Sequence, residues 1–315
     1  MGVMIDGKWQ TQSLTELAMG GDFRRKESNF RDWVKQGGEY PPEAGRYRLY
    51  VSLACPWAHR TLIMRALKGL DAMIPVSVVN WFMGEEGWTF EDGDAVAPDP
   101  VFAARYLRDV YAGAKPDYTG RVTVPVLLDS HTKQIVSNES SEIIRMFNSA
   151  FDGLGASPGD YYPQDLRREI DAVNGRVYDT LNNGVYKSGF ATTQAAYEKA
   201  VYPLFDTLEW MEERLSRQRW LAGDRFTEAD IRAFVTLIRF DPVYHGHFKC
   251  NRARIVDYPN LWAYSRQIYQ MPGVAETVNL THIKGHYYAS HESINPTRII
   301  AVGPELDYWQ PHGRG

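Results

Sequence analysis

The chain has 315 residues, a formal net charge of −4 and two cysteines, and these values exclude several classes of protein. A slightly acidic chain has no electrostatic reason to bind nucleic acid or an anionic membrane surface, and two cysteines cannot build a disulfide scaffold. The N-terminus lacks a secretory apolar stretch, and no apolar run approaches the roughly 18 residues of a spanning helix. We therefore expect a two-domain cytoplasmic protein with no nucleic-acid or membrane partner.

Residues 1–45 are polar and contain glycine and proline pairs, which predicts an extended lead-in. A strand–helix–strand pattern follows, with a strand over 46–52, a helix over 56–68 and a strand over 74–79. Residues 80–120 are rich in glycine and proline and predict a long loop. A connection of this length is typical of a functional segment.

The next elements are a predicted strand over 122–128, a short strand over 134–136 and a helix over 140–148. The order β-α-β-loop-β-β-α is typical of a thioredoxin-like domain. A glycine- and proline-rich stretch over 151–162 then predicts a linker.

Helical periodicity dominates the rest of the chain, and residues 227–230 have the pattern of an N-terminal capping box. The predicted helices cover about 164–183, 194–217, 227–239 and 258–270. The tail from Thr281 is predicted to be mostly irregular. The fold class is therefore an α/β thioredoxin-like domain with its N-terminal extension over 1–152, followed by an all-α domain with an irregular tail over 153–315.

Cys55 is the most informative residue, because the string Ser-Leu-Ala-Cys-Pro-Trp-Ala-His-Arg over 52–60 places it between a predicted strand and a predicted helix. Proline is favoured at the first helical position, so Cys55 should cap the helix N-terminus, where free N–H groups and the helix dipole stabilise a thiolate. Ala58 occupies the fourth position, so the resolving thiol has to come from another molecule. A lone cysteine is otherwise a small buried side chain, but this context favours a nucleophile.

Two further motifs lie where such a domain binds a peptide. Val124-Pro125 occurs where the fold places a cis proline beside the nucleophile, and a cis bond leaves the Val124 N–H and C=O able to pair with an extended peptide. The alternative is an ordinary edge-strand proline. At Glu139-Ser140 a predicted helix begins, and there the serine and the helix N–H groups can hold a carboxylate while the glutamate pairs with an ammonium. The alternative is a plain N-cap.

Other candidates are aromatic or basic. Trp88 in the long loop can stack on a ligand or plug the loop onto the core, and Arg121 can hold a carboxylate or be a solvated charge. Tyr186 and the tyrosines at 287–288 can stabilise or protonate a phenolate leaving group, or they can pack two domains together.

The sequence favours neither a metal site nor a second reactive thiol. His245 and His247 form a His-x-His pair, but no acidic residue or cysteine completes a recognisable ligand pattern around them. Cys250 lies in the other predicted domain from Cys55 and is interpreted as structural.

Together these motifs resemble those of the glutathionyl-hydroquinone reductases, the Xi class of the glutathione transferase superfamily. The resemblance runs from about residue 28 to the end and rests on 52–61, Gly87-Trp88, 124–127, Asn138-Glu139-Ser140, 239–241, 247–251, 286–288 and Asn295-Pro296. It implies a homodimer that uses glutathione as co-substrate without a metal. It also implies site residues: Cys55 is catalytic, glutathione contacts Trp88, Arg121, Val124, Glu139 and Ser140, and Tyr186 and Tyr287 line the substrate pocket.

The resemblance further implies a reaction. Cys55 attacks the sulfur of a glutathionyl-hydroquinone, the hydroquinone leaves, and a second glutathione resolves the Cys55–glutathione mixed disulfide by thiol–disulfide exchange. The alternatives are an omega-like thioltransferase or dehydroascorbate reductase, a conjugating transferase, and a noncatalytic binding protein on the same fold. Conjugation usually employs a serine or tyrosine, so a cysteine at position 55 argues against it.

Overall fold

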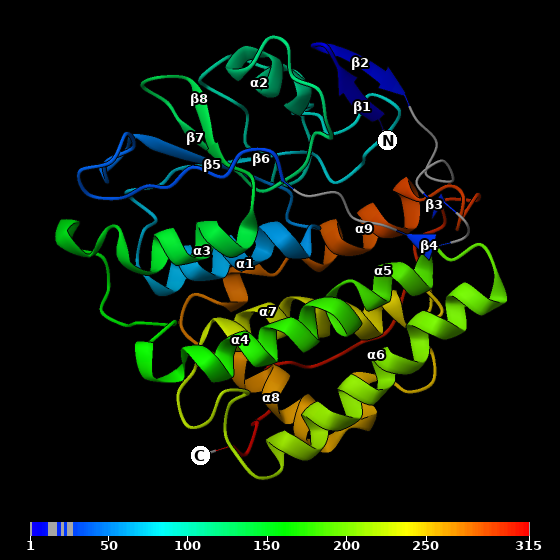
Figure 1. The fold of residues 1–315 in the computed structure, drawn as a ribbon. Helices are drawn as coiled ribbons and strands as arrows, with labels where there is room; N and C mark the ends of the chain where they lie inside the picture. Colours follow the sequence, from blue (N-terminus) through cyan, green and yellow to red (C-terminus); the bar gives the residue numbers. More distant parts are fainter. Residues whose placement is uncertain (1, 12–17, 20–21, 24–27, 315) are drawn as a thin grey trace. The chain divides into compact units, whose positions relative to one another are not determined.

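The computed structural model describes residues 2–11, 18–19, 22–23 and 28–314. The chain divides into two compact units. The first unit comprises Met1–Glu16, Lys26–Gly159 and Thr277–His286, and the second comprises Leu17–Arg25, Asp160–Glu276 and Tyr287–Gly315 (Figure 1). The main division falls between Gly159 and Asp160, a few residues beyond the position 152/153 predicted from the sequence.

The first unit is built on a four-stranded mixed sheet of order β6-β5-β7-β8. Its strands are β5 (Tyr47–Val51), β6 (Val76–Val78), β7 (Val126–Asp129) and β8 (Gln134–Ser137). β5 runs parallel to β6 and antiparallel to β7, and β7 runs antiparallel to β8. This is the thioredoxin-like arrangement expected from the element order, and all of β7 and nearly all of β5 is buried, as near-continuous apolar strands require.

Helices cover both faces of this sheet. α1 (Pro56–Leu67) and α3 (Ser140–Ser149) pack against each other on one face, and α2 (Leu107–Ala114) lies on the other (Figure 1). α1 and α3 confirm the predicted helices over 56–68 and 140–148. α2 corrects the interpretation of 80–120 as loop alone. It is a short helix held by its buried apolar face and by the Asp109 carboxylate, which accepts the Tyr106 N–H at 3.0 Å.

The predicted lead-in contains regular structure. β1 (Gly2–Ile5) and β2 (Lys8–Thr11) form an antiparallel hairpin, and β3 (Ala18–Met19) pairs with β4 (Asp22–Phe23). Asp6 and Gly7 both have positive φ, 47° and 75°, as a two-residue hairpin turn requires. The Asp-Gly pair was therefore a usable signal, and the prediction of an extended segment here was wrong. Residues 12–17, 20–21 and 24–27 of the predicted lead-in lie outside the described residues.

The second unit is helical, as predicted. Its helices are α4 (Arg167–Arg176), a π-helical turn (Val177–Asn182), α5 (Gly184–Gly189), α6 (Gln194–Leu215), α7 (Glu228–Arg239), a π-helical turn (Phe240–Tyr244) and α8 (Pro259–Tyr269), with short 3-10 turns at Gln164–Leu166 and Ile255–Asp257. The first predicted helix, over about 164–183, corresponds to the 3-10 turn, α4 and the π-helical turn in succession, and α5 follows it as a separate helix. Every residue of α7 is buried, so α7 forms the centre of the unit.

α7 begins at the predicted capping box. Thr227 Oγ1 accepts the Ala229 N–H, and the Asp230 carboxylate accepts the Thr227 N–H at 2.8 Å. The same carboxylate also accepts the Leu221 N–H and the Tyr264 hydroxyl. A helix that is buried all round has no solvent to satisfy its first N–H groups, so side chains have to do so.

The tail differs from its prediction. α9 (Leu280–Ser290) is a helix where the sequence predicted mostly irregular chain. It forms because tertiary contacts bury its residues. Ile283 is fully buried, and His282 Nε2 lies 2.6 Å from the Asp94 carbonyl oxygen within the first unit. The chain from 291 onward has no helix or strand among its described residues, as predicted.

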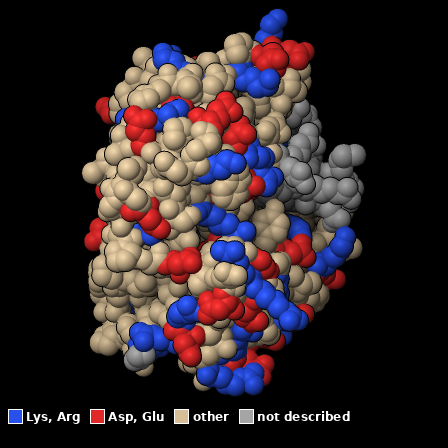
Figure 2. All heavy atoms as spheres, turned by 60° about the vertical axis from the view of Figure 1, so that its left-hand side comes forward, with Lys and Arg blue, Asp and Glu red and all other residues tan. Residues whose placement is uncertain are grey.

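Among the described residues no helix is both long and apolar enough to span a bilayer. Figure 2 shows one face of the molecule, on which lysine and arginine side chains are interspersed with acidic ones rather than gathered into one patch. A mixed surface of this kind fits a chain with a small net charge.

Candidate active site

Cys55 is the N-cap residue of α1, as the sequence predicts. Its backbone is extended, with φ −76° and ψ 121°, and Pro56 occupies the first helical position. The Cys55 carbonyl accepts the His59 N–H at 3.0 Å, which starts the helix. The thiol is partly exposed, so a small molecule in solution can reach it. A sulfur at this position faces the positive end of the helix dipole, which favours the thiolate.

The Val124–Pro125 peptide bond is cis, as predicted, and it lies next to the thiol. The Sγ atom of Cys55 is 3.6 Å from the Val124 carbonyl oxygen, which accepts the thiol hydrogen bond. The bond immediately precedes β7, the neighbour of β5, so the sheet itself places Val124 beside the start of α1. The backbone of Val124 and the thiol of Cys55 thus form one small polar site.

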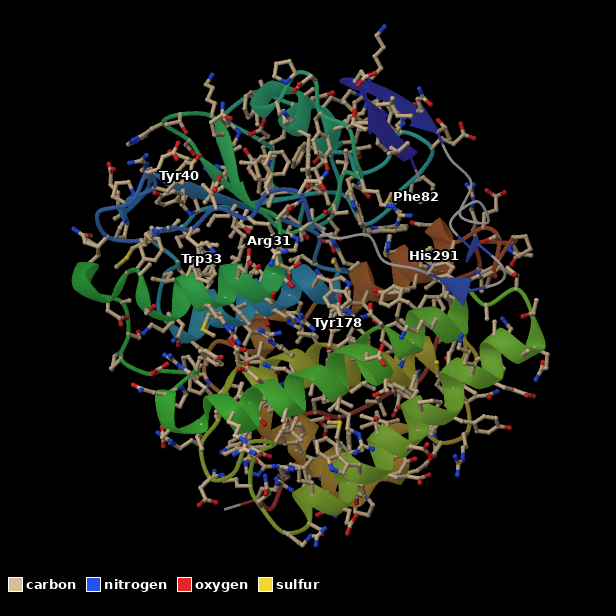
Figure 3. The ribbon with its side chains drawn as sticks, viewed as in Figure 1. Arg31, Trp33, Tyr40, Phe82, Tyr178 and His291 are labelled. Carbon is tan, nitrogen blue, oxygen red and sulfur yellow. The ribbon has the colours of Figure 1, made fainter. Side chains whose placement is uncertain are left out.

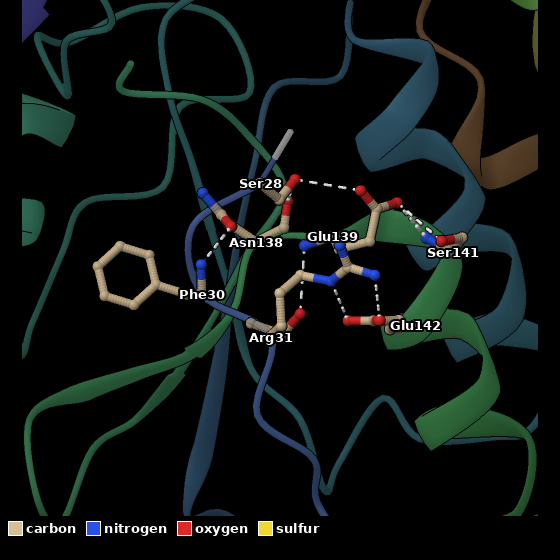
Figure 4. A network of polar contacts seen from close by, with 8 residues as sticks. Ser28, Phe30, Arg31, Asn138, Glu139, Ser141 and Glu142 are labelled. Carbon is tan, nitrogen blue, oxygen red and sulfur yellow. Dashed lines mark hydrogen bonds and ion pairs between the residues drawn. The ribbon is translucent and has the colours of Figure 1, made fainter. Parts of the chain in front are cut away.

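Glu139 is the N-cap residue of α3, and both of its carboxylate oxygens are held by hydroxyl or N–H donors. Oε1 accepts the Ser141 N–H at 2.9 Å and the Ser141 hydroxyl at 2.8 Å, while Oε2 accepts the Ser28 hydroxyl at 3.1 Å (Figure 4). Burial raises the pKa of Glu139, but the hydrogen bonds from Ser141 and Ser28 and the charge of Arg60 outweigh burial, so the pKa lies below its ordinary value. The carboxylate is therefore a fixed negative charge.

Ser140 follows directly and contacts a buried arginine. Arg60 of α1 donates from Nη1 toward Ser140 Oγ at 3.5 Å, and its guanidinium lies 4.4 Å from the centre of the Trp57 ring. Arg60 is 1% exposed. A buried arginine beside the N-terminus of α3 adds positive charge where the helix dipole already favours an anion. The sequence analysis did not assign Arg60 a role, although it belongs to the string that contains Cys55.

The end of the lead-in supports Glu139. Asp32 donates its N–H to Val136 of β8 at 2.9 Å, and Phe30 exchanges hydrogen bonds with Asn138 (Figure 4). This segment places Ser28 over the Glu139 carboxylate. Arg31, labelled in Figures 3 and 4, pairs with the Glu142 carboxylate at 2.8 Å through Nε. A sequence signal for this extra pairing was absent, because the segment is polar and irregular in pattern.

Trp88 is packed. It is 8% exposed, and its ring stacks on His286 with centroids 4.8 Å apart. Its carbonyl accepts the Leu107 N–H at 2.9 Å, which ties the loop to α2. Arg121 is half-buried and precedes the cis proline segment, with its carbonyl accepting the Tyr118 hydroxyl at 2.8 Å. The roles of both side chains in ligand binding stay predictions.

Three tyrosines meet within the second unit. The Tyr287 hydroxyl lies 2.5 Å from that of Tyr186 and 2.9 Å from that of Tyr244. Burial raises the pKa of Tyr244 and of Tyr287 well above the ordinary value. Tyr288 instead donates to the Pro242 carbonyl at 3.3 Å. Tyr287, rather than Tyr288, therefore joins Tyr186.

A histidine pair lies beside these tyrosines. His247 Nε2 is 3.2 Å from Nδ1 of His291, which Figure 3 labels, and Phe248 packs against both rings and against Tyr287. Burial and the charge of Lys249 lower the pKa of His247 to about 4, so it is neutral near pH 7. Within the described part of the chain no group of three or more His, Cys, Asp or Glu side chains is arranged to hold a metal ion.

Comparisons with known proteins identify the family. Residues 54–150 match the model described as glutathione S-transferase, N-terminal domain, and 194–267 match the corresponding C-terminal domain. The chain is 60% identical to the glutathionyl-hydroquinone reductase PcpF of Sphingobium chlorophenolicum over 96% of both proteins. It is 55% identical to the glutathionyl-hydroquinone reductase YqjG of Escherichia coli, covering all of this chain and 98% of that protein. The chain belongs to the glutathionyl-hydroquinone reductases, the Xi class of the glutathione transferases.

Solved structures agree. The glutathione-bound structure of YqjG from Escherichia coli K-12 superposes with a TM-score of 0.92 at 53% identity over 99% of both chains. The Xi class transferase from Natrialba magadii gives 0.94 at 48% identity over 100% of this chain and 96% of that one. The predicted family and the predicted fold, a thioredoxin-like domain followed by a helical transferase domain, are confirmed.

In this Xi-class chain, the structure gathers the predicted glutathione-side residues Cys55, Val124, Glu139 and Ser140 around the N-termini of α1 and α3. Within the second unit, Tyr186 of α5 and Tyr287 of α9 are brought together. Sequence reasoning missed Tyr244, although its segment 239–251 is dense in functional side chains. Cys250 is buried and burial raises its pKa to about 12, which fits a structural thiol.

Proposed function

We propose that this protein reduces glutathionyl-hydroquinones to hydroquinones at the expense of glutathione. The observation that carries the proposal is the partly exposed Cys55 thiol, placed at the start of α1 and 3.6 Å from the carbonyl of a cis-proline segment. The relatives named above that share 60% and 55% of the sequence are glutathionyl-hydroquinone reductases. A thiolate at a helix N-terminus is the nucleophile that attack on sulfur needs.

The reaction balances as two thiol steps. A proton first adds to the ring carbon that bears the glutathionyl sulfur while a ring hydroxyl gives up its proton, which converts the ring to its ketone tautomer. The Cys55 thiolate then attacks that sulfur, the carbon–sulfur bond breaks, and its electron pair stays with the ring as a phenolate, which takes up a proton and leaves as the hydroquinone. The Cys55–glutathione disulfide is then attacked by a second glutathione thiolate, which releases glutathione disulfide and the free Cys55 thiolate.

Glutathione binding is assigned to the charges and backbone around Cys55. The Val124 N–H and C=O would pair with the cysteinyl part of the tripeptide, as an extended peptide pairs with a strand. The N-terminus of α3, with Ser140 and the buried Arg60 beside it, suits the α-carboxylate of the γ-glutamyl group, and the ionised Glu139 suits its ammonium. Trp88 and Arg121 are assigned to the rest of the tripeptide, with Arg121 facing a carboxylate.

We assign the supply of the proton that adds to the ring carbon to Tyr186, Tyr244 and Tyr287. Tyr186 is half-buried, whereas Tyr244 and Tyr287 are 0% and 1% exposed, so Tyr186 is the member that can contact a substrate. When Tyr186 gives up its proton, the Tyr287 hydroxyl at 2.5 Å can donate to the phenolate, and Tyr244 can donate to Tyr287 in turn. A chain of hydroxyls stabilises the anion because each oxygen keeps a donor. We therefore assign substrate contact to Tyr186 and its support to Tyr287.

The decisive experiment is intact-protein mass spectrometry after brief exposure to a glutathionyl-hydroquinone without free glutathione. One glutathionyl group on Cys55, with one equivalent of hydroquinone released, is the expected result. The Cys55→Ser variant should stay unmodified and serves as the control. An unmodified wild-type Cys55 with intact substrate contradicts the proposal. If glutathione disulfide nevertheless modifies Cys55, the protein acts as a disulfide-directed thioltransferase instead.

We also propose that the protein works as a homodimer in a reducing compartment, the cytoplasm, with no metal. The proposal rests on the family and on the chemistry of Cys55, since a thiolate nucleophile persists only where thiols stay reduced. Light scattering after gel filtration should give about twice the chain mass of 36.0 kDa. A mass equal to one chain at micromolar concentration would contradict the dimer.

A further inference from the structure

The N-terminal hairpin β1–β2 is attached to the segment that leads to Arg121. Met4 exchanges two backbone hydrogen bonds with Gly120, both at 2.9 Å, and the Gly7 N–H donates to the Tyr118 carbonyl at 3.0 Å. Met4 is 2% exposed, so its side chain is a buried anchor. A Cβ atom on Gly7 would lie 1.9 Å from the Pro116 carbonyl oxygen, so the turn needs glycine to approach this closely. The hairpin is thus docked at the residue directly before Arg121.

The other strand of the hairpin reaches the turn before Trp88. Trp9 donates its indole N–H to the Glu85 carbonyl at 3.1 Å. Its ring lies against Gly87, where an added Cβ would be 3.0 Å from Trp9 Cη2. Gly87 has φ +77°, in the region that favours glycine, and it closes a turn by donating to the Gly84 carbonyl. Trp9 therefore covers a tight turn that ends at the residue before Trp88.

Arg108 of α2 completes this contact. Its guanidinium lies 5.1 Å from the centre of the Trp9 ring and 4.1 Å from that of Tyr106, so two aromatic rings hold it. Arg108 also donates to the Glu86 carbonyl at 2.9 Å and pairs with the Glu86 carboxylate. The turn 84–87 is thus held by hydrogen bonds to two consecutive carbonyls, Glu85 from Trp9 and Glu86 from Arg108.

We propose that Trp9 is a positioning residue for glutathione binding, and that the hairpin β1–β2 clamps the segments that present Trp88 and Arg121. This inference rests on the proposed roles of those two side chains. A hairpin of two four-residue strands is marginal alone, so its stability comes from the same docking contacts that hold the loops. Loss of the Trp9 ring frees the Glu85 carbonyl and uncovers Gly87, and small displacements of binding groups weaken binding strongly.

The test compares the full-length variants Trp9→Ala, Trp9→Phe and Lys8→Ala. Lys8 is exposed on the adjacent position of β2, and alternation places it on the opposite face, so it is the matched control. Three quantities are measured: the Kd for S-methylglutathione by calorimetry, kcat and KM with a glutathionyl-hydroquinone, and the rate of Cys55 alkylation by iodoacetamide in the free enzyme.

In Trp9→Ala, the Kd for S-methylglutathione and the KM should both rise roughly tenfold, which corresponds to the loss of one contact of ordinary strength. The kcat should stay within about twofold of the parental value. Trp9→Phe keeps a ring over Gly87 and loses the indole donor, so its Kd should rise only about threefold. Lys8→Ala should match the parent. Alkylation of Cys55 should proceed at the parental rate in all three, because the thiol site is built by α1 and Val124.

Two results would overturn the inference. One is parental Kd and KM in Trp9→Ala, or in Trp9→Phe if the alanine variant does not fold. The other is a joint fall of kcat, Cys55 reactivity and melting temperature, which would make the hairpin a general support of the fold. If the parent protein itself fails to bind S-methylglutathione, it is the proposed function that fails, because no Trp9 substitution is involved.

Discussion

The starts of α1 and α7 present the same backbone feature and serve opposite purposes. At α7, Thr227 and Asp230 cap the helix with side-chain oxygens, and the site is fully buried. At α1, the N-cap residue is Cys55, its side chain makes no capping hydrogen bond, and the thiol is partly exposed. The helix N-terminus favours an anion in both places. The capping side chains at α7 are used up in hydrogen bonds that hold the fold, while the sulfur at α1 is the one proposed for chemistry.

The N-terminus of α3 combines features of the other two. Its N-cap carboxylate, Glu139, caps the helix through Ser141 and is also fixed by Ser28 from the lead-in. The pKa of Glu139 lies below its ordinary value, whereas burial raises the pKa of Asp230 to about 6. Both carboxylates accept hydroxyl and N–H donors, so the difference lies in burial and charge: Glu139 is only half-buried and lies near Arg60, whereas Asp230 is fully buried and its burial outweighs its hydrogen bonds.

The largest effect is expected from Cys55→Ser, which replaces the thiol at the N-cap of α1 with a hydroxyl, the side-chain group of a common N-cap residue. Deglutathionylation should fall by at least about a thousandfold, because a serine hydroxyl is hardly ionised near neutral pH. Cys250→Ala, at the buried thiol, is the control and should keep most of the activity. Release of hydroquinone followed by liquid chromatography measures both. Substantial activity in Cys55→Ser would show that the α1 cap is not the nucleophile.

The next largest effect is expected on the pH dependence of stability, through Asp230 in the buried capping box of α7. The folded-state pKa of Asp230, about 6, exceeds its ordinary value of 3.8, so the folded chain binds this proton more tightly than the unfolded chain. The contribution of Asp230 to the free energy of unfolding is therefore present below about pH 4 and is lost as pH rises through about 6. At about 1.4 kcal/mol per pKa unit, that loss is roughly 3 kcal/mol.

Urea unfolding between pH 4 and pH 7 measures this contribution. Asp230→Asn should lower the free energy of unfolding, because its amide NH2 replaces one of the two carboxylate oxygens and so faces the N–H of either Leu221 or Thr227. It should also remove the part of the pH dependence that this carboxyl causes. The same pH slope in parent and variant would show that Asp230 does not titrate in this range.

A smaller effect is expected from Glu139→Gln. The substitution keeps an acceptor for Ser141 and removes the charge assigned to the glutathione ammonium, so KM should rise roughly tenfold to a hundredfold with a smaller change in kcat. Glu142→Gln in the same helix is the matched control. It removes the ion pair with Arg31, which is 48% exposed, and should change KM by less than about twofold. Equal KM changes in both variants would contradict the assignment.

The smallest effect should come from Tyr244→Phe, which removes one hydroxyl behind Tyr287. We expect kcat to fall by about threefold to tenfold, because the phenolate left on the relay loses one hydrogen bond. Tyr288→Phe is the control, since the Tyr288 hydroxyl bonds to the Pro242 carbonyl and lies outside the relay. Steady-state measurement of kcat compares the two variants. A larger loss in Tyr288→Phe would reverse the choice between the neighbouring tyrosines.

Local patterns were sufficient for much of the first unit. The strand before Cys55, Pro56 at the first helical position and the apolar run behind it are determined by neighbours in sequence, so α1 and its cap could be predicted. The same holds for the capping box at Thr227 and for the long helix α6. The family, and with it the cis bond before Pro125, followed from the motifs.

Apart from the β1–β2 hairpin, whose Asp-Gly turn is a local signal, the failed predictions share a cause. α2 and α9 are short helices, of 8 and 11 residues, whose stability depends on burial against distant parts of the chain. Pairing of the lead-in with β8 is equally nonlocal, because Phe30 and Asp32 meet residues about a hundred positions later. Periodicity in a short window cannot report such contacts.

The amino-acid sequence by itself determined the family, the helix α1 with Cys55 at its N-cap and hence the candidate nucleophile, because these depend on residues adjacent along the chain. Only the tertiary structure decided that Ser28 contacts the Glu139 carboxylate and Arg60 the Ser140 hydroxyl, that Tyr244 bonds to Tyr287, and that Trp9 covers the turn before Trp88. Each of these pairs joins residues far apart in sequence, and such a pair exists only once the fold has brought its backbone segments together.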